Sequence, residues 1–305
     1  MKHFPKLLYL FIKRRCWSPD QQHISKIFFL FLFLSQQSFS NNIQQNLFLN
    51  RGTFIAVNST TFSFLAFNST SNFISRNEDL SFLPYDSITF NIHNNDTAIH
   101  GFAVKNYAGS VTIAAGDSAN FLFTSSTNGL FIYYDNFNYP TNRYLGAAGI
   151  ISINNYSGKK YFWNMKEHES MFTDTIVQGG IVNWNNYEPD FFTINGLSYP
   201  DIQNDTTSKI VAHVGDTIHI YIANTGQSLH SLHFHGFHCR AIYSSSTTIG
   251  IDWVKDTYAI RSMETCILEL VPDKVGLYSV HDHNLAALSG GGTHPNGMFT
   301  IMLIQ

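Results

Sequence analysis

The sequence has little charge of either sign. Only 13% of its 305 residues are Asp, Glu, Lys or Arg, and its formal net charge at pH 7 is −3. Binding to nucleic acid needs a dense basic surface, and the basic clusters here are only Arg14-Arg15, with Lys13 before it, and Lys159-Lys160. The composition therefore excludes nucleic acid as a partner. The chain is instead rich in apolar material, 44% hydrophobic and 15% aromatic, which is typical of a well-cored protein.

Cysteine is scarce as well. The three cysteines are Cys16, Cys239 and Cys266, and the first lies in a segment that we expect to be removed. In an exported protein the other two could form a disulfide, or both could be buried apolar positions. The sequence leaves both alternatives open.

Long apolar runs are absent except for one near the N-terminus. Basic residues, ending at Lys26, precede residues 27–34 (IFFLFLFL), and the small-residue stretch 38–40 follows. This order predicts an export signal at residues 1–40 and a secreted or periplasmic protein. The run is too short to span a bilayer, which takes about 20 apolar residues, so no stable membrane span is expected after cleavage. A retained signal anchor is the alternative.

No segment has a convincing helical periodicity. Short β-branched and aromatic runs alternate with polar residues from residue 52 onward, as in 88–92 (ITFNI), 217–222 (TIHIYI) and 265–270 (TCILEL). Gly, Asn, Asp and Pro bound these runs. The pattern predicts an all-β sandwich or barrel of antiparallel strands.

The chain also contains a degenerate internal repeat. Four landmarks recur in the same order: residues 86–94 match 216–224, His100-Gly-Phe echoes His235-Gly-Phe, 129–135 match 276–282, and 146–153 match 297–304. By strict spacing, however, His100 matches His230. Two copies of one β-sandwich, with a boundary near residues 154–160, explain this repeat.

Histidines gather in the second copy, where seven of the fourteen lie between residues 230 and 294. His233 and His235 are two residues apart in a strand-like run, as are His281 and His283. Side chains at positions i and i+2 of a strand point to one face, so each pair presents two imidazoles together. Imidazole binds copper and zinc, and the sequence therefore predicts a metal site.

These histidines carry a family resemblance. Residues 230–236 (HSLHFHG) resemble the first ligand motif of multicopper oxidases, and 276–283 (GLYSVHDH) with 294–298 (HPNGM) resemble the second. Residues 188–196 (EPDFFTING) and 214–217 (VGDT) are also similar to the final domain of that family. The resemblance implies two tandem cupredoxin-like Greek-key β-sandwich domains, at residues 50–155 and 156–305.

Carried over to this chain, the resemblance implies two metal sites. His233, His235, His281 and His283 correspond to one half of an oxygen-reducing copper cluster. His230, residue 282, His294 and Met298 correspond to a mononuclear electron-accepting centre. The family has a cysteine at residue 282, whereas this chain has Asp282. A blue copper site requires a thiolate, so His230, Asp282 and His294 form either a two-histidine, one-carboxylate metal site or a hydrogen-bonded remnant.

The first copy departs further from the family pattern. It has Tyr134-Asp135-Asn136 where the second has His-Asp-His, and Arg143 stands near the place of His294. His100, with His93 at most, is its only candidate ligand, and His100 could equally be a packing or hydrogen-bonding residue. A complete three-copper cluster is therefore not expected.

We expect an exported copper-binding protein, with zinc as the second candidate metal. If it is an enzyme, it is an atypical copper-dependent oxidoreductase that acts on a small reductant or ion. The resemblance also implies a homo-oligomer, for which a trimer is the expectation. The alternatives are a non-catalytic metal-binding or scaffold protein and an adhesive β-sandwich without metal.

Overall fold

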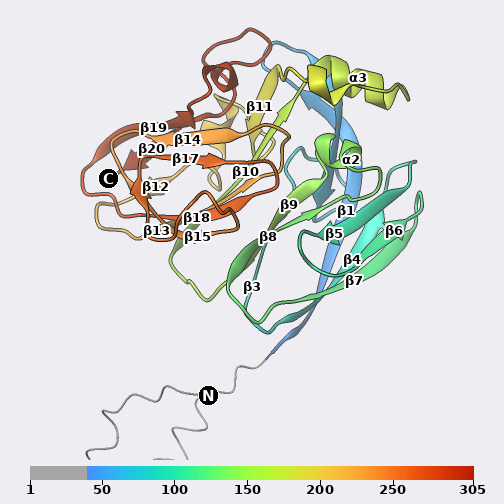
Figure 1. The fold of residues 1–305 in the computed structure, drawn as a ribbon, viewed down its shortest axis with the longest axis horizontal. Helices are drawn as coiled ribbons and strands as arrows, with labels where there is room; N and C mark the ends of the chain where they lie inside the picture. Colours follow the sequence, from blue (N-terminus) through green and yellow to red (C-terminus); the bar gives the residue numbers. More distant parts are fainter. Residues whose placement is uncertain (1–39) are drawn as a thin grey trace, which may run out of the picture. The chain divides into compact units, whose positions relative to one another are not determined.

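The computed structural model describes residues 40–305, of which Asn41–Gln305 form one compact unit. Residues 1–39, with most of the predicted export segment and Cys16, lie outside the described part, so export stays a prediction. Within residues 40–305 no helix is long and apolar enough to cross a membrane. The strands form four sheets, two from each half of the chain (Figure 1).

The N-terminal half contributes the first two sheets. The four-stranded sheet has the order β2 (Thr61–Asn68), β1 (Asn42–Ile55), β4 (Ser87–Asn94), β7 (Ser118–Thr124). The five-stranded sheet has the order β3 (Asp79–Phe82), β9 (Ala148–Ile153), β8 (Gly129–Tyr134), β5 (His100–Val104), β6 (Ser110–Ile113). β1 begins ahead of the predicted domain start at residue 50, because residues 42–49 pair in parallel with β4.

The C-terminal half contributes the other two sheets. The six-stranded sheet has the order β11 (Phe191–Ile194), β10 (Lys159–His168), β13 (Ile218–Asn224), β18 (Thr265–Leu270), β15 (Cys239–Ser244), β16 (Val254–Lys255). The five-stranded sheet has the order β12 (Val211–Ala212), β20 (Phe299–Ile304), β19 (Gly276–Asp282), β14 (His230–Phe234), β17 (Thr257–Ile260).

The two halves share one topology. The order β2-β1-β4-β7 matches β11-β10-β13-β18, and β3-β9-β8-β5-β6 matches β12-β20-β19-β14-β17. The parallel pairs correspond too, since β1 with β4 matches β10 with β13, and β3 with β9 matches β12 with β20. The other strand pairs described are antiparallel, as expected from the sequence. The internal repeat is therefore a structural repeat.

Alternation along the strands explains why each half closes into a sandwich. In β4, Ile88, Phe90 and Ile92 are buried, and the residues between them are partly exposed. Such a period of two turns every second side chain toward a core. One core forms around Phe90 and its neighbours in the N-terminal half, and a second around Trp163 in the C-terminal half.

A third apolar cluster joins the two halves. It packs Leu130 and Ile150 of the N-terminal half with Tyr221 and Ile267 of the C-terminal half. Short helices complete the chain: α2 (Thr141–Tyr144), α3 (Ser170–Val177), and the 3-10 helices η1 (Trp184–Asn186), η2 (Asp201–Asn204) and η3 (Leu285–Leu288). The sequence pattern predicted none of these helices, of which the eight-residue α3 is the longest among the described residues.

A buried asparagine fixes the start of the equivalent strands β5 and β14. Asn94 donates from Nδ2 to the carbonyl oxygens of Ala98 (2.8 Å) and Ile113 (3.1 Å). Asn224 likewise donates to those of Ser228 and Ile260, both at 2.8 Å. His100 opens β5 as His230 opens β14. The match of His100 with His230 by spacing is therefore the structural one, and the match of the two His-Gly-Phe tripeptides is wrong.

We predict that Asn224→Ala lowers the free energy of unfolding by about 2 kcal/mol or more, because a buried polar group left without a partner costs about 1–3 kcal/mol. The change leaves two carbonyl groups and the N–H of Gly226, which donates to Asn224 Oδ1 at 3.0 Å, without their partner. Denaturant unfolding measures the effect. Asn91→Ala, which removes an exposed bond to Asn46, is the control and should change stability by less than about 0.5 kcal/mol.

Candidate metal centre

Alternation along β14 and β19 sorts the predicted ligands onto two faces. His230 of β14 and Asp282 of β19 are buried in the sandwich, whereas His233 and His281 lie on the opposite, partly exposed face. The antiparallel register places His233 directly opposite His281. We call His233, His235, His281 and His283 the outer histidine group, and Glu167, His230 and Asp282 the buried triad.

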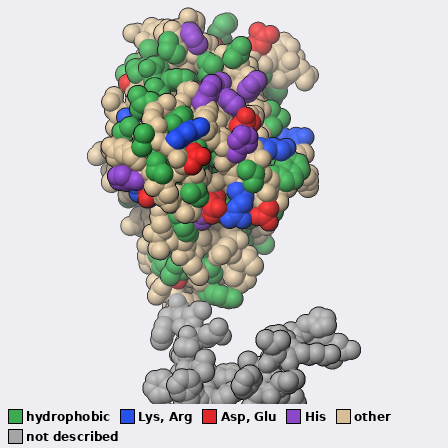
Figure 2. Space-filling view, turned by 90° about the vertical axis from the view of Figure 1, so that its left-hand side faces the viewer, with side chains coloured by type: hydrophobic (Ala, Val, Ile, Leu, Met, Phe, Trp, Pro, Cys, Tyr) green, Lys and Arg blue, Asp and Glu red, His purple; other side chains and the backbone are tan. Residues whose placement is uncertain are grey.

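The four rings of the outer histidine group lie next to one another. The centroid of the His233 ring is 4.7 Å from that of His235, 5.6 Å from that of His281 and 5.7 Å from that of His283. The Nε2 atoms of His235 and His281 face each other at 2.9 Å. Figure 2 shows histidine side chains close together on the surface of the C-terminal half. The two pairs, 46 residues apart in sequence, therefore meet as the sequence predicted.

Hydrogen bonds at Nδ1 orient two of these rings. His233 Nδ1 lies 2.8 Å from Thr257 Oγ1, which donates in turn to Asp256 Oδ1 at 3.1 Å. His281 Nδ1 donates to the carbonyl oxygen of Asp282 at 2.8 Å. A histidine that donates through one nitrogen presents the lone pair of the other. Both rings thus present Nε2 as the available donor atom.

The donor set fits a copper or zinc ion in its chemistry. Burial, with the neighbouring His233 and His281, lowers the pKa of His235 and favours the neutral ring that binds metals. Across residues 40–305, no three His, Cys, Asp or Glu side chains form a ready-made coordination sphere. The outer histidine group is therefore a set of adjacent donors, and metal binding requires its rings to rotate.

The buried triad holds an imidazole between two carboxylates. His230 Nδ1 is 2.5 Å from Asp282 Oδ2, and its Nε2 is 2.8 Å from Glu167 Oε2; all three side chains are 0% exposed. Burial opposes charge on His230, but the bonds to Asp282 and Glu167 outweigh it and raise the pKa of His230 to about 9. Burial also opposes charge on Glu167, yet its bonds to His230 and two backbone N–H groups lower its pKa to about 2. The triad is an ion cluster at neutral pH.

This arrangement corrects one expectation for the mononuclear centre. Both nitrogens of His230 are engaged by carboxylates, so His230 has none free for a metal ion. His294 lies exposed, and its Nδ1 donates to the carbonyl oxygen of Leu288 at 3.0 Å. Met298 is fully buried in the C-terminal core. In the described chain no hydrogen bond or ring contact joins His294 to His230 or Asp282, and the hydrogen-bonded remnant is the alternative that the geometry favours.

The N-terminal half repeats the buried arrangement but lacks the outer donors. His100 is fully buried, with Nδ1 2.6 Å from Asp135 and Nε2 2.8 Å from Asp96, so it acts as a hydrogen-bonding residue. Where the C-terminal half pairs His233 with His281, this half pairs Ala103 with Tyr134. The equivalent positions thus cannot supply a second set of imidazoles.

Sequence reasoning missed Glu167 and Thr257, which carry no motif. The match of His100 with His230 and of Asp135 with Asp282 between the two copies of the repeat was the one signal that could have revealed the repeated ion pair. Both Cys239 and Cys266 are free thiols in the C-terminal core, and burial raises the pKa of each. The buried apolar alternative for the cysteines is therefore the one observed.

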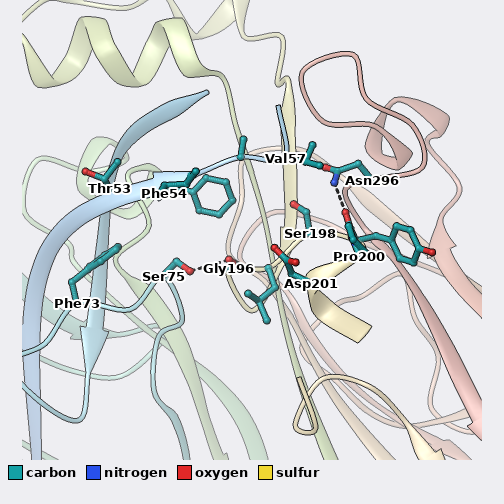
Figure 3. A pocket seen from close by; sticks show the side chains of 14 residues that line it. Thr53, Phe54, Val57, Phe73, Ser75, Gly196, Ser198, Pro200, Asp201 and Asn296 are labelled. Atoms are coloured by element: carbon teal, nitrogen blue, oxygen red, sulfur yellow. Dashed lines mark hydrogen bonds between the residues drawn. The ribbon is translucent and has the colours of Figure 1, made fainter. Parts of the chain in front are cut away.

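A cavity of about 380 Å³ opens elsewhere, where the end of β1 meets the loop after β11. Phe54 and Phe73 lie on one side of it and Asp201 on the other (Figure 3). Ser75 donates to the carbonyl oxygen of Gly196 at 3.0 Å and ties the two walls together. None of the predicted ligands lines this cavity, so it is separate from the metal centre.

The sequence comparisons address one part of the chain. Residues 180–294 match the family model described as multicopper oxidase, and this stretch contains the outer histidine group. A search of curated proteins finds no match.

Solved structures extend the likeness to most of the chain. The blue copper oxidase from Nitrosomonas europaea is 20% identical with a TM-score of 0.74, covering 87% of this chain and 86% of that one. The multicopper oxidase mgLAC is 19% identical with a TM-score of 0.73 and the same coverage. The copper nitrite reductase from N. europaea is 18% identical with a TM-score of 0.69, covering 87% of this chain and 94% of that one. At such identities the likeness concerns the fold.

We predict that Glu167→Gln lowers the free energy of unfolding at pH 6 by about 2–3 kcal/mol, because a neutral amide replaces the charged acceptor of the bond from His230 Nε2. Denaturant unfolding measures this loss. Glu188→Gln makes the same chemical change on an exposed side chain and should be nearly neutral.

The loss in Glu167→Gln should depend on pH. Because the pKa of His230 is raised, its stabilising contribution is complete below the unfolded-state pKa of about 6.5 and is lost as pH rises through about 9. The difference between wild type and Glu167→Gln should therefore shrink from pH 6 to pH 10. A difference that stays constant over this range would contradict a charged His230.

The strand topology, the family model and the solved structures all agree on the fold and on the family that this chain resembles. The strand order repeats between the halves, and the residues matched by the family model include the four imidazoles that the C-terminal half brings together. The fold of two tandem cupredoxin-like β-sandwiches is confirmed, and with it the resemblance of this chain to the multicopper oxidase family.

Proposed function

We propose that this protein binds copper through the outer histidine group and acts as a copper-dependent oxidoreductase without a thiolate electron-entry centre. The observation that carries the proposal is the 2.9 Å approach of His235 Nε2 to His281 Nε2. Two neutral imidazole nitrogens at this distance must share a proton, and a metal ion can take the place of that proton. Bound there, copper would supply a one-electron redox couple.

The surroundings of the donors support this role. The Nδ1 bonds of His233 and His281 fix each ring from behind, as outer hydrogen-bond partners of metal ligands do. Imidazole alone suits both copper and zinc. The solved structures of similar fold are named as copper proteins, and none of the three described above is named for zinc, so copper is the metal that we propose.

The same geometry makes the proposed chemistry atypical. A protonated His230 between two carboxylates occupies the place of an electron-accepting centre, so a reductant would have to react close to the outer histidine group itself. A small reductant or ion is the substrate class that such an exposed set of donors would accept. Export, and a trimer that places a neighbouring subunit over this face, are further parts of the proposal.

A second candidate function follows from the buried triad. A protein that kept the sandwich and the outer donors but lost electron entry would bind metal without turnover. The fully hydrogen-bonded state of His230 favours this non-catalytic metal-binding or scaffold role. Measurement of metal content and turnover on one preparation separates the two functions.

We predict that purified protein loaded with Cu(II) retains copper after dialysis, and that His281→Ala weakens copper affinity by more than about 100-fold, since loss even of an outer partner of a ligand costs 10–100-fold. Metal analysis and competitive titration measure this. His213→Ala alters an exposed histidine outside the group and should keep full affinity.

Turnover is measured on the same proteins with phenols and Fe(II) as reductants. Copper-dependent oxidation that disappears in His281→Ala supports the oxidoreductase, whereas retained copper without oxidation supports the non-catalytic role. Negligible copper in the wild type would overturn both.

We also predict that the copper-loaded protein lacks intense blue colour, because that colour requires a thiolate ligand. Asp282 stands at the thiolate position, and Cys239 and Cys266 are enclosed in the core. Visible absorption spectroscopy checks this. A strong blue band would show that a cysteine has become a ligand and would contradict the assignment of the donors.

A further inference from the structure

A small cavity lies beside the outer histidine group. It has a volume of about 240 Å³ and runs along β17, the edge strand that pairs with β14. Thr257 lines the cavity and also accepts the hydrogen bond from His233 Nδ1. Because Thr257 stands directly opposite His233 in the strand pairing, the cavity and the imidazoles share one face of the sheet.

The charges around this cavity have one sign. Its lining includes Lys255 and Arg261 and no carboxylate. The Lys255 ammonium lies 3.9 Å from the centroid of the Trp253 ring, and Arg261 donates to Thr248 Oγ1 at 2.9 Å. Both cations are thereby held at the wall. The lining therefore favours an anionic ligand.

The nearest acids do not neutralise the cavity. Asp256 directs its carboxylate at Thr257 and His233, on the side of the histidines. Glu264 accepts a hydrogen bond from the backbone N–H of Arg261 at 3.0 Å, but its carboxylate lies 4.0 Å from the guanidinium, and the Arg261 side chain is 54% exposed, so solvent screens this ion pair. Lys255 has no carboxylate within ion-pair distance among residues 40–305, and its charge is free to meet a ligand.

Apart from the hydroxyl groups of Thr248, Thr257 and Tyr258, the rest of the lining is apolar. Trp253 and Leu229 are large hydrophobic side chains that stay 43% and 47% exposed, and Ile249 and Ala259 complete the wall. Drug-sized ligands need about 300–1,000 Å³, so this cavity takes a smaller molecule, of the size of a single ring. A ligand with a flat apolar ring and one negative charge would complement both the apolar side chains and the two cationic side chains of the lining.

We infer that this cavity binds a small aromatic carboxylate, with the carboxylate at Lys255 and Arg261 and the ring beside Trp253. The inference rests on the proposed function in one respect, since it makes this ligand class the substrate presented to metal at the outer histidine group. The binding step itself needs no metal, because all of its contacts come from the protein.

The test is a calorimetric titration of metal-free protein with benzoate. We expect saturable 1:1 binding, with benzamide, the neutral analogue, bound at least about tenfold more weakly, as hydrogen bonds to charged groups exceed neutral ones. Lys255→Met and Arg261→Met should each weaken benzoate binding by about tenfold. Lys274→Met is the matched control, because Lys274 also lies over aromatic rings, 5.5 Å from that of Phe237, but does not line this cavity.

Each result decides the inference. No saturable binding, equal affinity for benzamide, or full affinity in both Lys255→Met and Arg261→Met would overturn it. Copper content of the same variants keeps the two proposals apart. Copper without benzoate binding overturns the cavity assignment alone, and benzoate binding without copper overturns the proposed metal function alone.

Discussion

The structure of the C-terminal half depends on one buried charge, the imidazolium of His230. Its partners Glu167 and Asp282 come from β10 and β19, so the triad ties both sheets of the sandwich to β14. Removing either carboxylate leaves one ring N–H of His230 in the core without its charged acceptor, which costs about 1.5–3 kcal/mol. This constraint holds β14 and β19 in one register, and that register sets His233 opposite His281. The exposed donors are therefore positioned from inside the sandwich.

The N-terminal half indicates that a buried histidine between two carboxylates has a structural role in this fold. His100 also lies between two carboxylates at the start of the equivalent strand, but Asp96 comes from the loop just before β5 and not from the other sheet. No imidazoles stand above His100, since Ala103 pairs with Tyr134 there. Since the ion cluster occurs with and without outer histidines, the carboxylate at residue 282 serves the sandwich first. Its position between His281 and His283 follows from strand alternation, which sends one residue inward and its neighbours outward.

Much of this was predictable from local pattern. The alternation of apolar and polar residues predicted the strands, and the internal repeat predicted two copies of one topology. The two-residue spacing of His233 with His235, and of His281 with His283, predicted that these side chains share a face. Glu167 was not predictable, because it reaches His230 across 63 residues from a strand with no motif. The choice between a partner charge and a metal at His230 likewise depends on which atoms surround its two nitrogens, which only the folded chain shows.

The two proposals meet on a single surface. Because carboxylates enclose His230, the proposed copper chemistry would have to take place at the accessible donor atoms of the outer histidine group. His235 and His283 are exposed on the outer face, and the cationic cavity along β17 opens onto that face through Thr257. Thr257 is the side chain that the cavity and the outer histidine group share. If both proposals hold, a molecule bound at Lys255 and Arg261 and a metal bound by the imidazoles would therefore lie on the same face of the sheet.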